Sequence, residues 1–188
     1  MEHESPASWR MAMLSHVGRV RARNEDFVFC DEVLGVAALA DGMGGHAGGD
    51  VAARLAVDAW VGRIRKCPVE PVGERDLRVA VADANRVVFA AACADPALRR
   101  MGTTLVAACF RRDDTLLTCN VGDSRLYRLR GDVLSCLTRD HSVLRAQCDA
   151  GMIESESNGP RALRGLLTRA VGVAACVVAD VTISTLQP

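Results

Sequence analysis

The change in the hydrophobic pattern after residue 94, from helical spacing to short strand-like runs, constrains the fold of this 188-residue chain most. Apolar residues recur at helical spacing in two segments, 50–66 and 74–94. The second helix is expected to end near Asp95-Pro96, because proline disfavours the helical conformation of the residue before it. The later segments are short apolar or alternating runs, which are typical of strands. Two adjacent helices inserted among many short strands predict an α+β protein in which helices stack on sheets.

Turn signals separate the predicted strands. A buried strand at 34–40 ends at Asp41 and opens into the glycine-rich loop 42–49. An antiparallel meander is predicted for the four runs 103–110, 115–121, 124–129 and 133–137. Beyond it we expect a short helix at 141–151, a polar surface segment at 154–165 and a final strand at 175–186.

Charge and length exclude several classes of protein. Lys plus Arg equal Asp plus Glu at 23 each, so the basic excess of a non-specific nucleic-acid or membrane-surface binder is missing. No stretch approaches the roughly 18 uninterrupted apolar residues of a membrane span, and the start lacks the apolar region of a signal peptide. The length suits one domain spanning 1–188.

The eight cysteines point to a reducing, cytoplasmic location. No two of them have the C-x-x-C spacing of a zinc or redox motif. Cys109, Cys119 and Cys136 lie in apolar runs, where we expect free, buried thiols.

Four carboxylates stand at predicted strand ends or in tight turns: Glu25, Asp26, Asp41 and Asp123. Gly42 follows Asp41 and Gly122 precedes Asp123, and glycine lets another backbone come close. Carboxylates and backbone carbonyls are the ligands that hard cations such as Mg²⁺ and Mn²⁺ prefer. Two such ions can activate a shared water and clamp a phosphoryl group.

Arg21, five residues before Asp26, could present a bidentate guanidinium to the same phosphate. From the residues alone, the alternative that these acids are ordinary turn residues stays open.

A dinucleotide site is the rival interpretation of the glycine-rich loop. Residues 42–47 fit G-x-G-x-x-A between a strand and a helix. However, Asp41 would place a carboxylate beside the pyrophosphate, and a proline-containing segment, 67–73, stands where a second parallel strand is required. A P-loop is excluded because no Lys-Ser/Thr pair ends the loop.

Six blocks of the chain resemble, in family order, the bacterial form of the metal-dependent (PPM, type 2C) protein serine/threonine phosphatases. They are 18–26 (GRVRARNED), 40–46 (ADGMGGH), 101–104 (MGTT), 120–125 (NVGDSR), 138–142 (TRDHS) and 167–172 (LTRAVG).

The resemblance implies a β-sandwich flanked by antiparallel helices, with two Mn²⁺ or Mg²⁺ ions at one end. Asp41 would bridge both ions and the Gly42 carbonyl would bind one of them, while Asp26, with Glu25 nearby, would hold metal-bound waters. Asp123 would serve a third, weaker metal that some bacterial members carry, and Arg21 would take the phosphate. The segment 154–164 corresponds to the family's variable flap. A metal-activated water would hydrolyse phosphoserine or phosphothreonine without a covalent intermediate.

The resemblance stops before two further family blocks, a Ser-Asp-Gly and an Asp-Asn motif, whose aspartates are metal ligands. We therefore expect a C-terminally truncated domain, weak metal binding and low or absent activity for these 188 residues. His46 stands three residues beyond the position of the animal relatives' proposed general acid, held here by Met43, and is expected to order the loop or face solvent. We expect His141 at a turn or helix start and Asp140 as the cap of the following helix.

Three functions remain open on the sequence. The first is a cytoplasmic phosphatase acting on phosphoprotein substrates opposite a cognate bacterial Ser/Thr kinase, with no nucleic-acid or membrane partner. The second is a pseudophosphatase that keeps Arg21 and binds phosphoproteins without hydrolysing them. The third is a truncated, inactive gene product.

Overall fold

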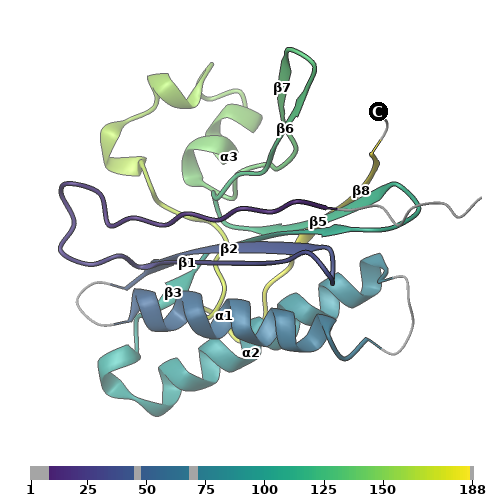
Figure 1. Ribbon diagram of the computed structural model, residues 1–188. Coiled ribbons are helices and arrows are strands. Elements are labelled where there is room, and N and C mark those ends of the chain that lie inside the picture. The colour runs from purple at the N-terminus through teal and green to yellow at the C-terminus, as the bar shows by residue number, and fades with distance from the viewer. Residues whose placement is uncertain (1–8, 45–47, 68–71, 187–188) are drawn as a thin grey trace, which may run out of the picture.

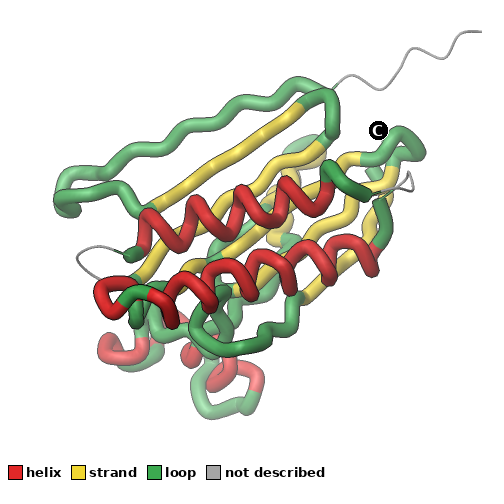
Figure 2. The backbone as a smooth tube through the Cα atoms, turned by 90° about the horizontal axis from the view of Figure 1, so that it is seen from below, coloured by secondary structure: helices red, strands yellow, loops and turns green. Residues whose placement is uncertain are grey.

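A six-stranded antiparallel sheet carries two antiparallel helices, α1 (Gly49–Ile64) and α2 (Glu74–Ala94), on one face (Figures 1 and 2). This is a computed structural model, and it describes residues 9–44, 48–67 and 72–186. The α+β class predicted from the sequence is confirmed. The strands of the main path, in spatial order, are β1 (Asp26–Asp31), β2 (Val36–Met43), β4 (Leu105–Phe110), β5 (Thr115–Val121) and β8 (Asp180–Thr185). The short β3 (Gly102–Thr103) pairs with the end of β2.

Small side chains let α1 lie close to the sheet. Ala52, Ala53 and Ala56 are fully buried, and Trp60 fills the space further along the same helix. On β2 every second residue from Val36 faces this core, as the two-residue period of a strand requires. The predicted strand at 34–40 is therefore present, shifted toward its end, and it is buried on one face rather than two: Leu39 is 36% exposed.

The helix boundaries agree with the sequence prediction to within two residues. Helix α2 begins after Gly73, whose N–H donates to the Asp76 carboxylate, and ends at Asp95 before the proline, as expected. Strand β1 was not predicted from the sequence, because its pairing with β2 depends on contacts between distant residues. Part of the linker between the helices, residues 68–71, lies outside the described residues, as do 45–47 with His46.

The predicted meander is wrong beyond β5. The chain leaves the sheet at Gly122, and β6 (Tyr127–Arg130) and β7 (Val133–Cys136) form a separate two-stranded sheet. The place beside β5 is taken by β8, which arrives from the far end of the sequence. The physical reason is the Gly122 backbone, whose φ of +106° turns the chain away from the ladder.

Cys136 is therefore exposed on this hairpin, although a buried thiol was expected. Cys109 and Cys119 are buried as predicted. All eight cysteines are free. Within the described residues, no helix is long and apolar enough to cross a membrane.

A buried asparagine ties the segment after residue 170 to α2. The Asn85 side chain is 1% exposed, accepts a bond from Gly172 N–H at 2.8 Å, and donates to the carbonyls of Ala174 and Ala175 at 3.0 and 3.1 Å. Buried polar groups that lose their partner cost about 1–3 kcal/mol each. This one side chain therefore fixes the path that leads to β8.

Asn85→Ala is expected to lower the free energy of unfolding by about 3 kcal/mol, because one buried N–H and two carbonyls lose their partner. Urea unfolding measures the change. Arg86→Ala, which removes an exposed neighbour on the same helix, is the control and should stay within about 0.5 kcal/mol. Equal effects for the two variants would contradict the anchoring role.

Candidate metal and phosphate site

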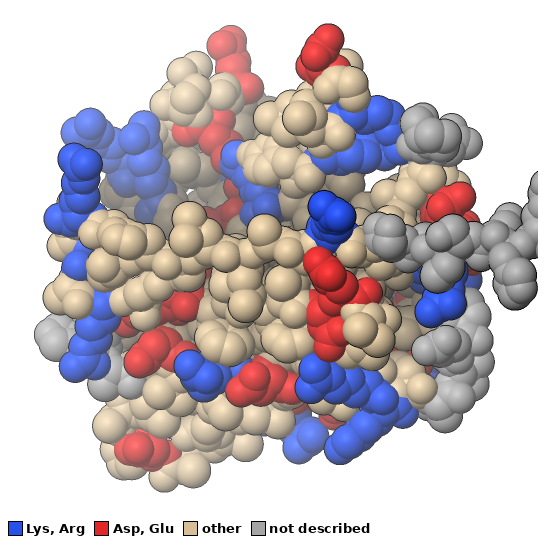
Figure 3. All heavy atoms as spheres, in the orientation of Figure 1, with Lys and Arg blue, Asp and Glu red and all other residues tan. Residues whose placement is uncertain are grey.

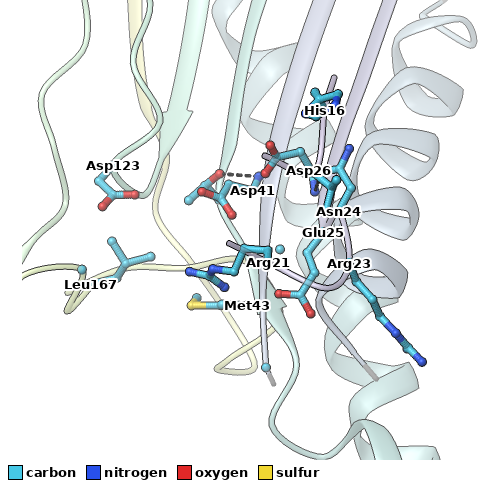
Figure 4. A pocket seen from close by; sticks show the side chains of 15 residues that line it. His16, Arg21, Arg23, Asn24, Glu25, Asp26, Asp41, Met43, Asp123 and Leu167 are labelled. Carbon is cyan, nitrogen blue, oxygen red and sulfur yellow. Dashed lines mark hydrogen bonds between the residues drawn. The ribbon is translucent and has the colours of Figure 1, made fainter. Parts of the chain in front are cut away.

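A pocket of about 440 Å³ opens at the end of the sheet where β1 begins and β2 ends (Figure 4). Five separate parts of the chain supply its walls. It is lined by His16, Val17, Arg21, Arg23, Asn24, Glu25, Asp26, Asp41, Gly42, Met43, Gly44, Thr104, Asp123, Gly165 and Leu167. All six residues singled out from the sequence, namely Arg21, Glu25, Asp26, Asp41, Gly42 and Asp123, are therefore brought together.

Strand register places two carboxylates face to face. Asp26 is the first residue of β1 and pairs directly with Asp41 on β2. Like charges opposite each other on neighbouring strands destabilise a sheet, so this pairing is costly unless a cation neutralises it. The Asn24 side chain accepts the Asp26 N–H at 3.1 Å and so fixes the start of β1.

Gly42 lies where three backbone segments meet. Its N–H donates to the Glu25 carbonyl at 3.0 Å. A Cβ on Gly42 would come within 2.0 Å of the Gly49 carbonyl oxygen and 2.7 Å of the Glu25 carbonyl oxygen. The close backbone approach predicted for this glycine is therefore confirmed, and it sets the Asp41-Gly42 pair against the start of α1.

Thr104 connects the two carboxylate-bearing segments and was not recognised in the sequence. Its hydroxyl accepts the Asp41 N–H at 2.9 Å and lies 2.7 Å from the Ser124 hydroxyl, next to Asp123. Its own N–H donates to the Asp41 carbonyl at 3.0 Å. The available signal was its position within the MGTT block between the two acids, but the pattern alone did not reveal the bridge.

Asp123 follows Gly122, a position at which both the backbone conformation and the available space require glycine. Gly122 has a φ of +106°, and a Cβ there would lie 2.6 Å from the Thr104 methyl group. The close approach expected at this glycine is present, since a Cβ would also lie 3.2 Å from the Thr104 Cα. The positive φ in addition turns Asp123 out of β5 toward the pocket, which was not expected from the sequence (Figure 4).

The electrostatics of the pocket favour a bound cation. Burial and the neighbouring carboxylates of Asp26 and Asp123 raise the pKa of Asp41, while Arg21 opposes this only in part. Burial and Asp140 likewise raise the pKa of Asp123. Both raised pKa values mean that negative charge here is insufficiently compensated by the protein.

This donor set fits a hard divalent cation that keeps part of its water. Asp26, Asp41, Asp123 and Gly42 line one pocket, and Mg²⁺ typically binds through one or two carboxylates while retaining waters. Among residues 9–44, 48–67 and 72–186, however, no three His, Cys, Asp or Glu side chains come close enough to form a metal cluster. These residues therefore fit a cation site in which water would supply part of the coordination.

Arg21 and Glu25 lie on opposite sides of the loop that precedes β1. The Arg21 side chain points into the pocket, toward the Asp41 side (Figure 4). The Glu25 carboxyl group packs against Gly49, since a Cβ on that glycine would lie 2.8 Å from the Glu25 Cδ. A carboxylate at the first residue of α1 interacts favourably with the helix dipole, so Glu25 also holds the loop against the helix.

Asp140 does not cap the following helix, contrary to expectation. Ser142 caps α3 (Val143–Asp149) by accepting the Arg145 N–H at 3.1 Å. Asp140 instead accepts two bonds from the Arg125 guanidinium, at 2.9 and 2.7 Å. His141 does stand just before the helix, but it is buried, at 5% exposure, rather than an ordinary turn residue.

Comparisons with known proteins agree on one family. The protein phosphatase 2C family model matches residues 16–149. The chain is 37% identical over 179 residues to a serine/threonine phosphatase stp of Listeria innocua, covering 90% of this chain and 69% of the relative. The crystal structure of the Mycobacterium tuberculosis serine/threonine phosphatase PstP/Ppp superposes with a TM-score of 0.81 at 35% identity, over 93% of this chain and 72% of that one. A PstP catalytic domain in complex with two manganese ions gives a TM-score of 0.79 at 34% identity, over 93% and 71% of the two chains.

Proposed function

Because the chain belongs to the protein phosphatase 2C family, we propose that it is a metal-dependent protein serine/threonine phosphatase. Its substrates are phosphoserine and phosphothreonine in proteins. The observation that carries the proposal is the convergence of Asp26, Asp41, Asp123 and Arg21 on one pocket. The proposal treats residues 1–188 as one phosphatase domain.

The proposed metal ligands are Asp26, Asp41 and the Gly42 carbonyl, with Asp123 for a third, weaker ion. Glu25 supports them by fixing the loop that carries Asp26. When bound, two Mn²⁺ or Mg²⁺ ions would supply an activated water and neutralise the phosphate for in-line attack.

The protein's own contribution to the reaction is charge and position. Arg21 presents a planar guanidinium that can form two parallel hydrogen bonds to phosphate oxygens. Thr104 bonds both backbone polar groups of Asp41, its N–H and its carbonyl, which keeps the carboxylate directed into the pocket. Preorganised charges of this kind lower the barrier because nothing has to move as the reaction proceeds.

Arg21→Ala is expected to raise the KM for a phosphothreonine peptide about tenfold or more, because the phosphate loses a charge-assisted, bidentate contact. Arg21→Lys should recover only part of this, since an ammonium cannot form the two-bond contact. Steady-state phosphate release in the presence of Mn²⁺, with EDTA as blank, measures the effect.

Arg19→Ala is the matched control, because Arg19 is an exposed arginine of the same segment that does not line the pocket. Equal KM values for Arg21→Ala and the unsubstituted chain would contradict the phosphate-binding role. Peptide binding without any metal-dependent release would instead indicate a pseudophosphatase.

The proposal extends to location and partners. A cytoplasmic location suits eight free cysteines, because cytoplasmic thiols stay reduced. The phosphoprotein substrates would be those of a cognate bacterial Ser/Thr kinase. Acidic and basic side chains alternate over α1 on the face seen in Figure 3, which suits protein substrates better than nucleic acid or a membrane surface.

A further inference from the structure

His141 contacts the turn that carries Asp123 at two successive peptide units. Its ring Nδ1 accepts the Gly122 N–H at 3.2 Å, and its own backbone N–H donates to the Gly122 carbonyl at 2.9 Å. The Gly122 carbonyl also accepts from Asn120 Nδ2 at 3.3 Å. The peptide groups on both sides of Gly122 are therefore held by one residue, and Asp123 begins immediately after them.

The outer edge of the His141 ring is fixed by two further segments. Its Nε2 lies 3.1 Å from Asp180 Oδ2 on β8 and 3.1 Å from Arg169 Nη1, and the same Arg169 nitrogen donates to Asp180 Oδ1 at 2.7 Å. Because Nδ1 accepts the Gly122 N–H, the proton of the neutral ring sits on Nε2 and is donated to Asp180. The His141 carbonyl in turn accepts the Thr168 N–H at 2.8 Å. Every polar group of His141 thus has a partner.

The turn needs an external support of this kind. Glycine has no side chain to hold its conformation, and Gly122 adopts a positive φ that costs backbone entropy on folding. His141 is 5% exposed, and neither it nor Asp180 lines the pocket. Its contacts therefore serve the turn and not a ligand.

We propose that His141 is a positioning residue: held by Asp180 and Arg169, it fixes the Gly122 peptide units and so directs Asp123 at the cation. This inference depends on the proposed function in one respect, namely that Asp123 binds a cation. Affinity for that cation then depends on Asp180, a residue of the last strand, through the chain of bonds Asp180–His141–Gly122. Losing an outer partner of a metal ligand typically costs about 10- to 100-fold in metal affinity.

The first experiment tests the bonds themselves by NMR of the 188-residue chain without metal. The His141 ring should show the tautomer with the proton on Nε2, and Asp180→Ala should speed exchange of the Gly122 amide about tenfold. Thr182→Ala is the matched control, since it removes another β8 side chain, one bonded to Thr118 at 2.6 Å. The opposite tautomer, or equal Gly122 exchange in both variants, overturns the proposal.

The second experiment tests the effect on the cation through the Mn²⁺ concentration that half-saturates thermal stabilisation. Asp180→Ala should raise it about tenfold, whereas Asp180→Asn, which keeps an oxygen acceptor for Nε2–H, should raise it less. In an Asp123→Ala background, Asp180→Ala should have no further effect on this concentration. If Asp180→Ala raises the half-saturating Mn²⁺ concentration equally with and without Asp123→Ala, the positioning role is overturned.

The two experiments separate this proposal from the proposed function. If the unsubstituted chain shows no Mn²⁺ response, the proposed function fails, while the amide exchange still decides whether His141 holds the turn. His141→Ala is not needed, so a variant that fails to fold does not interrupt the test.

Discussion

Gly42→Ala is expected to lower the free energy of unfolding by about 3 kcal/mol or more, at the upper end of what overpacking costs. The added Cβ would meet the carbonyl oxygens of Gly49 and Glu25 at 2.0 and 2.7 Å, and both are backbone atoms that no rotamer change can move aside. Relief requires moving the start of α1 away from β2. Chemical unfolding followed by circular dichroism measures the loss.

The control is a glycine without such neighbours. Gly62 lies in α1, and a Cβ at this position would have no neighbouring atom within 4 Å, so Gly62→Ala should raise the free energy of unfolding by about 0.5–1 kcal/mol. The two substitutions add the same methyl group and are expected to act in opposite directions. A Gly42→Ala variant as stable as the unsubstituted chain would contradict the close packing of β2 against the start of α1.

Asp41→Asn is expected to raise the stability of the metal-free chain and to abolish its stabilisation by Mn²⁺. Burial, Asp26 and Asp123 raise the pKa of Asp41 in the folded protein. The ionised carboxylate is therefore less favourable in the folded state than in the unfolded state at neutral pH. Asparagine removes this cost, and with it the charge that attracts the cation.

The pH dependence of stability follows from the direction of this shift. A raised pKa means that the contribution of Asp41 to stability is fully present below its unfolded-state pKa, about 3.9, and is lost as the pH rises through the folded-state pKa. Metal-free melting temperatures of the two chains should therefore converge at acidic pH and separate toward neutral pH, with the Asn variant higher. A metal-free Asn variant that is less stable at pH 7 would show that burial and the neighbouring acids do not disfavour the ionised Asp41 carboxylate.

The sequence predicted the parts of the site that depend on local chemistry. Asp41-Gly42 combines a strand end, an acid and a glycine, and each is visible without knowing the fold. Helix α2 was predicted at 74–94 and is observed with these bounds, because Pro96 marks its end. The family resemblance was confirmed by the match over residues 16–149.

What the sequence did not reveal depends on contacts between distant residues. Strand β1 became evident only from its register with β2, and Thr104 bridges to Asp41 across 63 positions. The role of Asp140 was wrong because Ser142 takes the helix cap and Arg125, 15 residues away, takes the carboxylate. The place of β8 beside β5 could not follow from local pattern, since β6 and β7 are closer in sequence.

Electron paramagnetic resonance of Mn²⁺ tests the central claim most directly, because the signal of the free ion falls as the protein binds it. Titrating the 188-residue chain, Asp41→Asn and Asp58→Asn compares a pocket acid with an exposed acid on α1. We predict binding in the unsubstituted chain and in Asp58→Asn, with a dissociation constant on the order of 10⁻⁴–10⁻³ M, and at least about tenfold weaker binding in Asp41→Asn. Equal binding by all three chains would contradict the assignment of Asp41 as the metal ligand on which the proposed phosphatase depends.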